Sequence, residues 1–270
     1  MSPKRIEAKF FVLFLLVLSL FSLPLFAQDM MRHVDLTSPD MVEAEMTREE
    51  LLKLLTSTKK GEVPDLSSKR LSGLDLSNVD FKSANLRSAR FNNTNLSGAD
   101  LSGVNLDIAW MMKANLENAN LSGASLFSTQ IQGSNLKNAN LTAARVVANL
   151  SHSDLDGANF TNANLAADMR NQSMGLMRAV MRSANLDNTN FTDAKAARSD
   201  LEFASLRGAN LSNADFALTA LAGADFEGAN VKGLILDGAD LESTRLIQLK
   251  FADEIIGIDT AKNLDEAIRE

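Results

Sequence analysis

Hydrophobic residues recur every five positions through most of the chain. The 37 units form three runs, with this position at every fifth residue from 66 to 146, from 150 to 165 and from 176 to 251. Leu or Phe occupies the position in 31 of them. Ala, Ser or Thr usually stands two residues earlier and Asn or Asp stands between them, as in Ala84-Asn85-Leu86. A period of five fits neither an amphipathic helix of period 3.6 nor a simple alternating strand.

The spacing inside each unit predicts a short extended piece followed by a turn. In extended backbone, residues two apart point the same way, so Ala119 and Leu121 should both face inward and Asn120 should face outward. The small residue leaves room for a neighbouring Leu, while Asn, Asp, Ser and Gly suit the tight turns. Such units bury little alone and should stack as coils that pair with their neighbours.

This pattern resembles the consensus Ala-(Asp/Asn)-Leu-x-x of the pentapeptide-repeat proteins. The resemblance covers Asp65 to about Phe251. It implies an all-β fold, a right-handed quadrilateral parallel β-helix with four units per coil and about nine coils. Leu or Phe and the small residue would fill the interior.

Both ends of such a column need covering, because unpaired edges promote aggregation. Thr47-Arg48-Glu49-Glu50 forms a capping box at the start of a helix, with Met46 and Leu51 placed as a hydrophobic staple. After Phe251 the repeat is lost, and Leu264, Ala267 and Ile268 at helical spacing predict a short closing helix. The C-terminal segment has a second interpretation as a homodimer contact, since the resemblance includes cytoplasmic members that pair through this end.

The first 27 residues have the layout of a secretory signal peptide. Lys4, Arg5 and Lys9 precede an apolar stretch, and Ala27 offers a small residue for cleavage before Gln28. We therefore expect a periplasmic or secreted protein without a membrane span after cleavage; an uncleaved anchor is the alternative. The expected organisation is a signal peptide (1–27), an N-terminal segment with a capping helix (28–63), the β-helix (64–251) and a C-terminal cap (252–270).

The clearest irregularity lies between Ala166 and Arg182, where four Met and three Arg residues interrupt the repeat. One interpretation is a protruding basic loop that contacts a partner and contributes little to folding, because Met-rich surfaces adapt to varied partners. The other is a degenerate coil whose Met side chains fill the core. A second irregularity is Trp110, an aromatic residue at the outward Asn/Asp position, which is either a partner anchor or a single exposed apolar residue. The candidate partner contacts are Arg170, Met174, Met177, Arg178, Arg182 and Trp110.

Composition excludes several chemistries. The chain has no Cys and only two His residues, His33 and His152, which leaves no thiolate site and little material for a His-based metal cage or catalytic triad. We expect no catalytic residues, no metal and no cofactor; a soft-metal site from Met169, Met174, Met177 and His152 lacks regular ligand spacing. The formal net charge is -7, and without a long basic run nucleic-acid binding has little support.

These observations favour an exported, non-enzymatic scaffold or protein-binding module whose partner is a protein or an envelope component. The alternative is a DNA-mimicking topoisomerase (gyrase) ligand, as the quinolone-resistance branch of the resembled family implies. That mimicry depends on an acidic column in the cytoplasm. Residues 64–251 carry 17 basic and 19 acidic groups, so the repeat region is nearly neutral.

Overall fold

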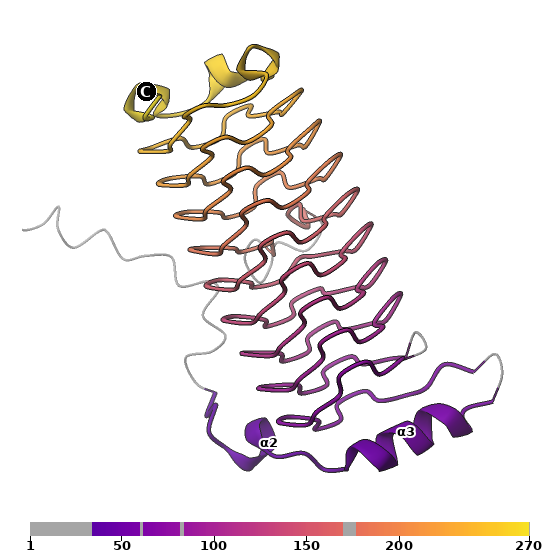
Figure 1. Cartoon of the computed structure of the whole chain (residues 1–270). Coiled ribbons are helices and arrows are strands. Elements are labelled where there is room, and N and C mark those ends of the chain that lie inside the picture. Colours follow the sequence, from indigo (N-terminus) through magenta and orange to yellow (C-terminus); the bar gives the residue numbers. More distant parts are fainter. Residues whose placement is uncertain (1–33, 60–61, 82–83, 170–176, 270) are drawn as a thin grey trace, which may run out of the picture.

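Each five-residue unit contributes one short extended piece, which pairs with the units one coil below and one coil above. The computed structural model describes residues 34–59, 62–81, 84–169 and 177–269, and these ranges form a column of stacked coils (Figure 1). All of the isolated bridges in the described ranges are parallel, and most join residues 20 apart, so four units make one coil. The bridged residues form four stacks along the column, which run from Asp65 to Ile256, from Arg70 to Lys262, from Asp75 to Ile268 and from Asp80 to Lys250.

The unit that begins at Asn120 shows why the sequence repeats. Leu121 and Ala124 are buried, and Gly123 adopts φ of 67° at the corner, in the left-handed region. The backbone N–H of Leu121 donates to the next coil at 2.7 Å, and the N–H of Ala124 donates to the Leu121 carbonyl at 3.1 Å to close the turn. Ala119 and Leu121 are 1% and 0% exposed, while Asn120 is half-buried on the outside, so the predicted inward and outward assignment is confirmed.

The N-terminal end is covered by a segment with two helices, α2 (Pro39–Val42) and α3 (Arg48–Ser57) (Figure 1). The predicted capping box is confirmed: the N–H of Glu50 donates to Thr47 Oγ1 at 3.2 Å, and the N–H of Thr47 donates to Glu50 Oε2 at 2.8 Å. Leu51 and Leu55 of α3 are buried against the column core. The open edge of the first coils is thus closed by apolar contact.

The C-terminal end differs from the expected single helix. After Lys250 the chain completes a last coil in steps of six residues, with bridges at Ile256, Lys262 and Ile268. Three short 3₁₀ helices replace the corner turns: η1 (Ala252–Glu254), η2 (Ile258–Thr260) and η3 (Leu264–Glu266). Six-residue units are long enough for a 3₁₀ turn, which explains why the helical spacing of the sequence does not yield an α-helix.

The inward position predicted for Phe251 is wrong. Its side chain is 48% exposed, and the residue has φ of 63° as the N-cap of η1. The same left-handed conformation recurs at Gly257 and Asn263, each directly after a bridged residue. In the regular coils the left-handed residue comes three residues after the bridged residue, as Gly123 does after Asn120. The corners of the last coil therefore have a different backbone conformation.

One face of the column carries a ladder of amides, and we call it the asparagine face. Its stack contains Asp80, Asp100, Asn120, Asn140, Asn159, Asn190, Asn210, Asn230 and Lys250. The amide of Asn120 donates to the Asp100 carboxylate at 3.1 Å, and its oxygen accepts from the Asn140 amide and the Ser122 N–H, each at 3.2 Å. Hydrogen bonds from the Ser102 hydroxyl and N–H, joined by the Asn120 amide, hold the pKa of Asp100 below its usual range. The side chains of this face therefore largely satisfy one another.

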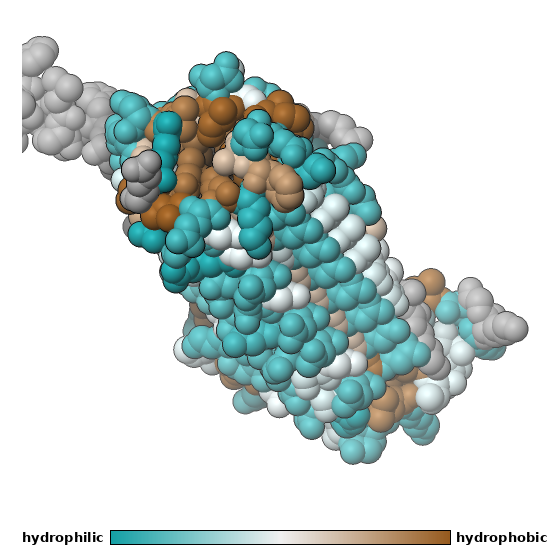
Figure 2. All heavy atoms as spheres, turned by 45° about the horizontal axis from the view of Figure 1, so that its top comes forward, coloured by the Kyte–Doolittle hydropathy of each residue, from teal (hydrophilic) through white to brown (hydrophobic). Residues whose placement is uncertain are grey.

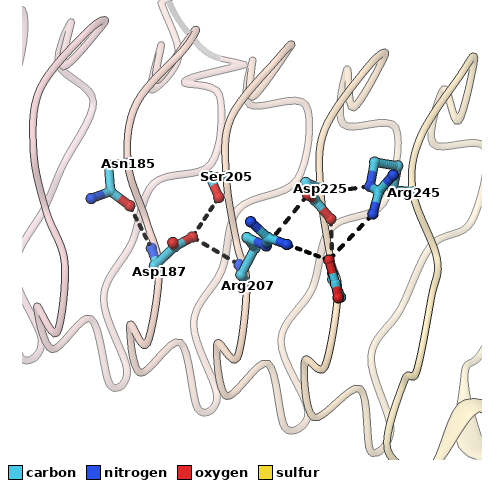
Figure 3. A network of polar contacts seen from close by, with 7 residues as sticks. Asn185, Asp187, Ser205, Arg207, Asp225 and Arg245 are labelled. Carbon is cyan, nitrogen blue, oxygen red and sulfur yellow. Dashed lines mark hydrogen bonds and ion pairs between the residues drawn. The ribbon is translucent and has the colours of Figure 1, made fainter.

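The next face in the direction of the N-terminus begins with a similar amide ladder, in which Asn95 donates to Asp75 at 2.9 Å and Asn115 donates to Asn95 at 3.2 Å. Its C-terminal half carries ion pairs, and we call it the charged face. Figure 3 shows its C-terminal part, where Arg207 lies between the carboxylates of the two neighbouring coils. The Arg207 N–H donates to Asp187 at 3.0 Å, and its guanidinium pairs with Asp225 at 3.6 Å and with Glu227. Arg245 approaches Asp225 at 3.3 Å and Glu227 at 3.2 Å from the coil above. The hydrogen bond from Arg207 lowers the pKa of Glu227.

Candidate interaction surface

The third face interrupts both patterns, and we call it the mixed face. Its stack contains Arg70, Arg90, Trp110, Gln130, Asn149, Val180, Asp200, Ala220, Asp240 and Lys262. No run of asparagine forms a ladder here. Trp110 is half-buried and bridges to Arg90 below and Gln130 above. The bridges also place Trp110 in the same stack as Val180, three coils away, or about 14 Å at a spacing of about 4.8 Å per coil.

The corner that leads onto the mixed face changes length twice. Between Arg145 and Asn149 it is one residue short, so the bridges across it shift from 20 to 19 residues. One coil later, Asn164 and Val180 are 16 residues apart instead of five, and the bridges across this coil join residues 31 apart. The four-residue step predicted from Val146 to Leu150 is therefore confirmed, and the irregular segment is an 11-residue insertion at one corner.

The base of the insertion is fixed to the column. The N–H of Asp168 donates to the Met177 carbonyl at 2.8 Å and closes the two ends of the insertion on each other. Arg145, which belongs to the coil below, pairs with Asp168 at 3.2 Å. The guanidinium of Arg145 also lies 4.1 Å from the centroid of the Phe127 ring, a cation–π contact. The two ends of the insertion are thus held in place against the column.

Two arginines on the C-terminal side of the insertion share one buried carboxylate. The Asp200 side chain is 2% exposed, and Arg178 and Arg182 each pair with its Oδ2 at 2.8 Å. Arg182 also pairs with Glu202 at 2.8 Å. Burial and the neighbouring Asp200 raise the pKa of Glu202. A buried carboxylate needs such partners, so both arginines contribute to the fold of this corner.

The predicted contact residues fall into three groups. Arg170 and Met174 lie outside the described residues, as does Leu176, which the grid had included. Trp110, Met177 and Arg178 are half-buried, and Arg182 is exposed. Trp110 and Arg182 lie on the mixed face, while Met177 and Arg178 lie at the corner before it, so the fold places these four on one side of the column.

Part of the segment behaves as core. Met181 is fully buried at an inward position. This burial and the two ion pairs to Asp200 contradict the expectation that the whole stretch from 166 to 182 contributes little to folding. Sequence reasoning missed Asp200, although a signal was present: Arg182 precedes Glu202 by one coil of 20 residues, so their side chains were bound to lie one above the other.

The described residues contain no group of three or more His, Asp or Glu side chains placed to hold a metal ion. His152 is an exposed corner residue, and the adjacent Ser151 hydroxyl donates to Asn149 at 2.7 Å. In the described part of the chain no helix has the length and apolar character that a bilayer span requires.

Four stacks of five-residue units, with one altered corner, define a four-sided solenoid repeat protein. The model of pentapeptide repeats matches in eight copies, at residues 70–107, 113–142, 148–167, 176–213 and 209–248, and the chain belongs to this family. No curated protein matches the chain.

Several solved structures are similar to it. HetL, a pentapeptide repeat protein involved in heterocyst differentiation regulation from the cyanobacterium Nostoc sp. strain PCC 7120, is 24% identical with a TM-score of 0.44, over 83% of this chain and 94% of HetL. Full-length QnrB1, a plasmid-mediated fluoroquinolone resistance protein, is 15% identical with a TM-score of 0.41, over 68% of this chain and 95% of QnrB1. A pentapeptide repeat protein from the Arabidopsis thaliana thylakoid lumen is 20% identical with a TM-score of 0.21, over 63% of this chain and 88% of that protein.

Proposed function

We propose that the chain is an exported, non-enzymatic scaffold that binds a protein or envelope component through the mixed face and its altered corner. The column is taken as right-handed, the sense that the family resemblance implies. One observation carries the proposal. Among the described residues between Asp65 and Lys250, before the six-residue steps of the last coil, the register of the repeat changes only at this corner, where an insertion with a fixed base meets the face that holds Trp110.

Regular faces offer poor specificity because they present the same groups in every coil. On the asparagine face those groups are already hydrogen-bonded to one another. The mixed face instead presents different side chains in successive coils, among them the half-buried Trp110 and Met112. Aromatic residues and Met are enriched at the centres of protein interfaces, so Trp110 and Met112 offer an anchor on this face.

Export is supported by the sequence of residues 1–27, which lie outside the described residues. Mass spectrometry of the protein from its native host should find a mature chain that begins near Gln28. A full-length cytoplasmic product would contradict export and return attention to the topoisomerase alternative. The paired carboxylates of the charged face and the neutral asparagine face argue against that alternative, because DNA mimicry requires exposed, unneutralised acid groups.

Site-specific photo-crosslinking tests the face. A photoreactive amino acid at Trp110 or Met112 should give a discrete crosslinked product in the envelope fraction of living cells. The matched controls are Thr142 and Thr161, half-buried residues of the asparagine face in nearby coils. Equal crosslinking from both faces, or crosslinking only from the controls, would contradict a contact through the mixed face.

A further inference from the structure

The C-terminal end of the column leaves apolar side chains uncovered. Inward residues of the last coils that would be buried beneath a further coil remain half-exposed, among them Leu249, Ile255, Ile258 and Leu264. Figure 2 shows apolar residues gathered on this end, with hydrophilic residues around and between them. Ile256 and Ile268 of the same coil are 51% and 42% exposed. Apolar surface of this extent on a soluble protein usually marks an interaction site.

The three 3₁₀ helices bring acidic groups to the corners of this surface. η1 carries Asp253 and Glu254, η2 carries Asp259, and η3 carries Asp265 and Glu266. All five side chains are exposed, and within the described ranges none of them takes part in an ion pair, whereas the carboxylates of the charged face are paired. Lys250 and Lys262 lie at bridged positions on the sides of the column, and the remaining cation, Arg269, donates to the Leu264 carbonyl at 2.6 Å.

The five exposed carboxylates around this surface determine which kind of partner it can bind. Two copies that met end to end would bring their unpaired carboxylates together, because a symmetric dimer opposes the same patch on both subunits. An anionic membrane would be repelled for the same reason. A partner with basic groups around an apolar centre would gain both the apolar contact and opposite charge at every corner.

We propose that this C-terminal end surface binds a partner protein that presents apolar side chains ringed by lysine or arginine. The surface is defined by the half-exposed Leu249, Ile255, Ile258 and Leu264, the exposed Ile256 and Ile268 at its edge, and the five carboxylates named above. The inference rests on the proposed function, a binding scaffold, but assigns a surface different from the mixed face. The partner docks through side chains, since the backbone of the last coil turns away at Phe251, Gly257 and Asn263.

A binding titration with a synthetic probe tests the surface. The probe is a fluorescein-labelled amphipathic helical peptide of Leu and Lys, and its match contains Glu in place of Lys. The intact protein should bind the Lys peptide at one site and should bind the Glu peptide at least tenfold more weakly. Comparable binding of both peptides would overturn the charge argument.

Two variants with matched controls locate the site. Replacing Asp253, Asp259 and Asp265 by Asn removes one carboxylate from each 3₁₀ helix and should weaken Lys-peptide binding about tenfold. The control replaces Glu43, Glu49 and Glu62 at the N-terminal end by Gln, which removes the same charge elsewhere. Ile256→Ser should also weaken binding, while Phe203→Ser, which removes a 64% exposed side chain from another coil, should not. Equal losses in variants and controls would overturn the assignment.

Sedimentation velocity separates the competing occupant. The proposal expects a monomer across the concentrations of the titration. A dimer that is lost in Ile256→Ser would overturn the proposal and support the homodimer interpretation of the C-terminal segment. If residues of the mixed face fail to crosslink while the Lys peptide still binds the C-terminal end surface, the result would contradict the mixed face as the partner-binding face. It would still support the assignment of the C-terminal end surface.

Discussion

The asparagine face and the mixed face are built on the same backbone, yet they use their outward positions in opposite ways. On the asparagine face, the Asn120, Asn140 and Asn230 amides each donate to the outward side chain one coil below, so the same contact recurs along the face. On the mixed face, Trp110, Val180 and Ala220 cannot make such a ladder, and the corner beside them changes length. Backbone pairing and the shared core therefore hold the coils together where no side-chain ladder is present, and the outward positions are free either to reinforce the column or to vary.

The largest expected effect concerns the core that both faces share. Leu121 lies behind the asparagine face and Leu201 behind the mixed face, and both are fully buried. Leu121→Asp and Leu201→Asp should each unfold the protein, because an unpaired carboxylate cannot be accommodated there. Circular dichroism at 25 °C would report this loss. A folded Leu201→Asp beside an unfolded Leu121→Asp would mean that the mixed face is locally independent of the column.

The second prediction separates a structural role from a binding role at the altered corner. Removing Arg178 and Arg182 together by substitution with Ala should lower the free energy of unfolding by about 3–5 kcal/mol, because Asp200 would stay buried without a partner. Adding Asp200→Asn should restore part of the loss. Arg198→Ala, at the same corner one coil above, is the control and should change stability by about 0.5 kcal/mol or less. Urea unfolding of the three variants and the unsubstituted protein provides the measurement. A double Arg variant as stable as the control would contradict the role assigned to Asp200.

The third prediction compares single outward positions. Asn120→Ala should cost about 1–2 kcal/mol, since it removes an amide that donates to Asp100 and accepts from Asn140. Asn120→Ser should cost a similar amount, more than its half-exposed position suggests from sequence alone. On the mixed face, Ala220→Ser should change the midpoint in urea very little, because no ladder passes through it. Equal costs on the two faces would show that the ladder adds nothing to stability.

The smallest effects concern pH, and they have opposite signs on the two faces. The pKa of Asp100 is lowered in the folded protein by its hydrogen bonds, so its contribution to stability is present above the unfolded value of about 3.9 and is lost as pH falls below it. The pKa of Glu202 is raised by burial and by Asp200, so its ionised form weakens the fold once pH rises above the unfolded value of about 4.3. Asp100→Asn should therefore lower Tm slightly at pH 7, and Glu202→Gln should raise it. The same sign for both variants would contradict the opposite environments.

Much of this architecture follows from the sequence because it is periodic. The inward placement of Ala119 and Leu121, the capping box at Thr47 and the short corner after Val146 all rest on local spacing, which a single chain displays directly. The exposure of Phe251 could not be predicted in this way. The units change from five to six residues after Lys250, but Phe251 still falls at the hydrophobic position of the five-residue repeat. The pairing of Arg178 with Asp200 could not be read either, because Arg178 lies at the end of the insertion, two residues before the regular coil resumes at Val180, and the sequence does not show where the insertion ends.

A stack of identical coils carries a hazard that a globular core lacks, because each finished coil is a template for the next one. Any chain with the same spacing, including another copy, could continue the pattern and extend the column into a fibre. The left-handed residues at Phe251, Gly257 and Asn263 remove that template, since each alters the backbone immediately after the bridged residue, at the position that would otherwise pair onward. The last coil thus acts as a chain terminator for assembly: it ends polymer growth through backbone geometry, without needing a bulky cap.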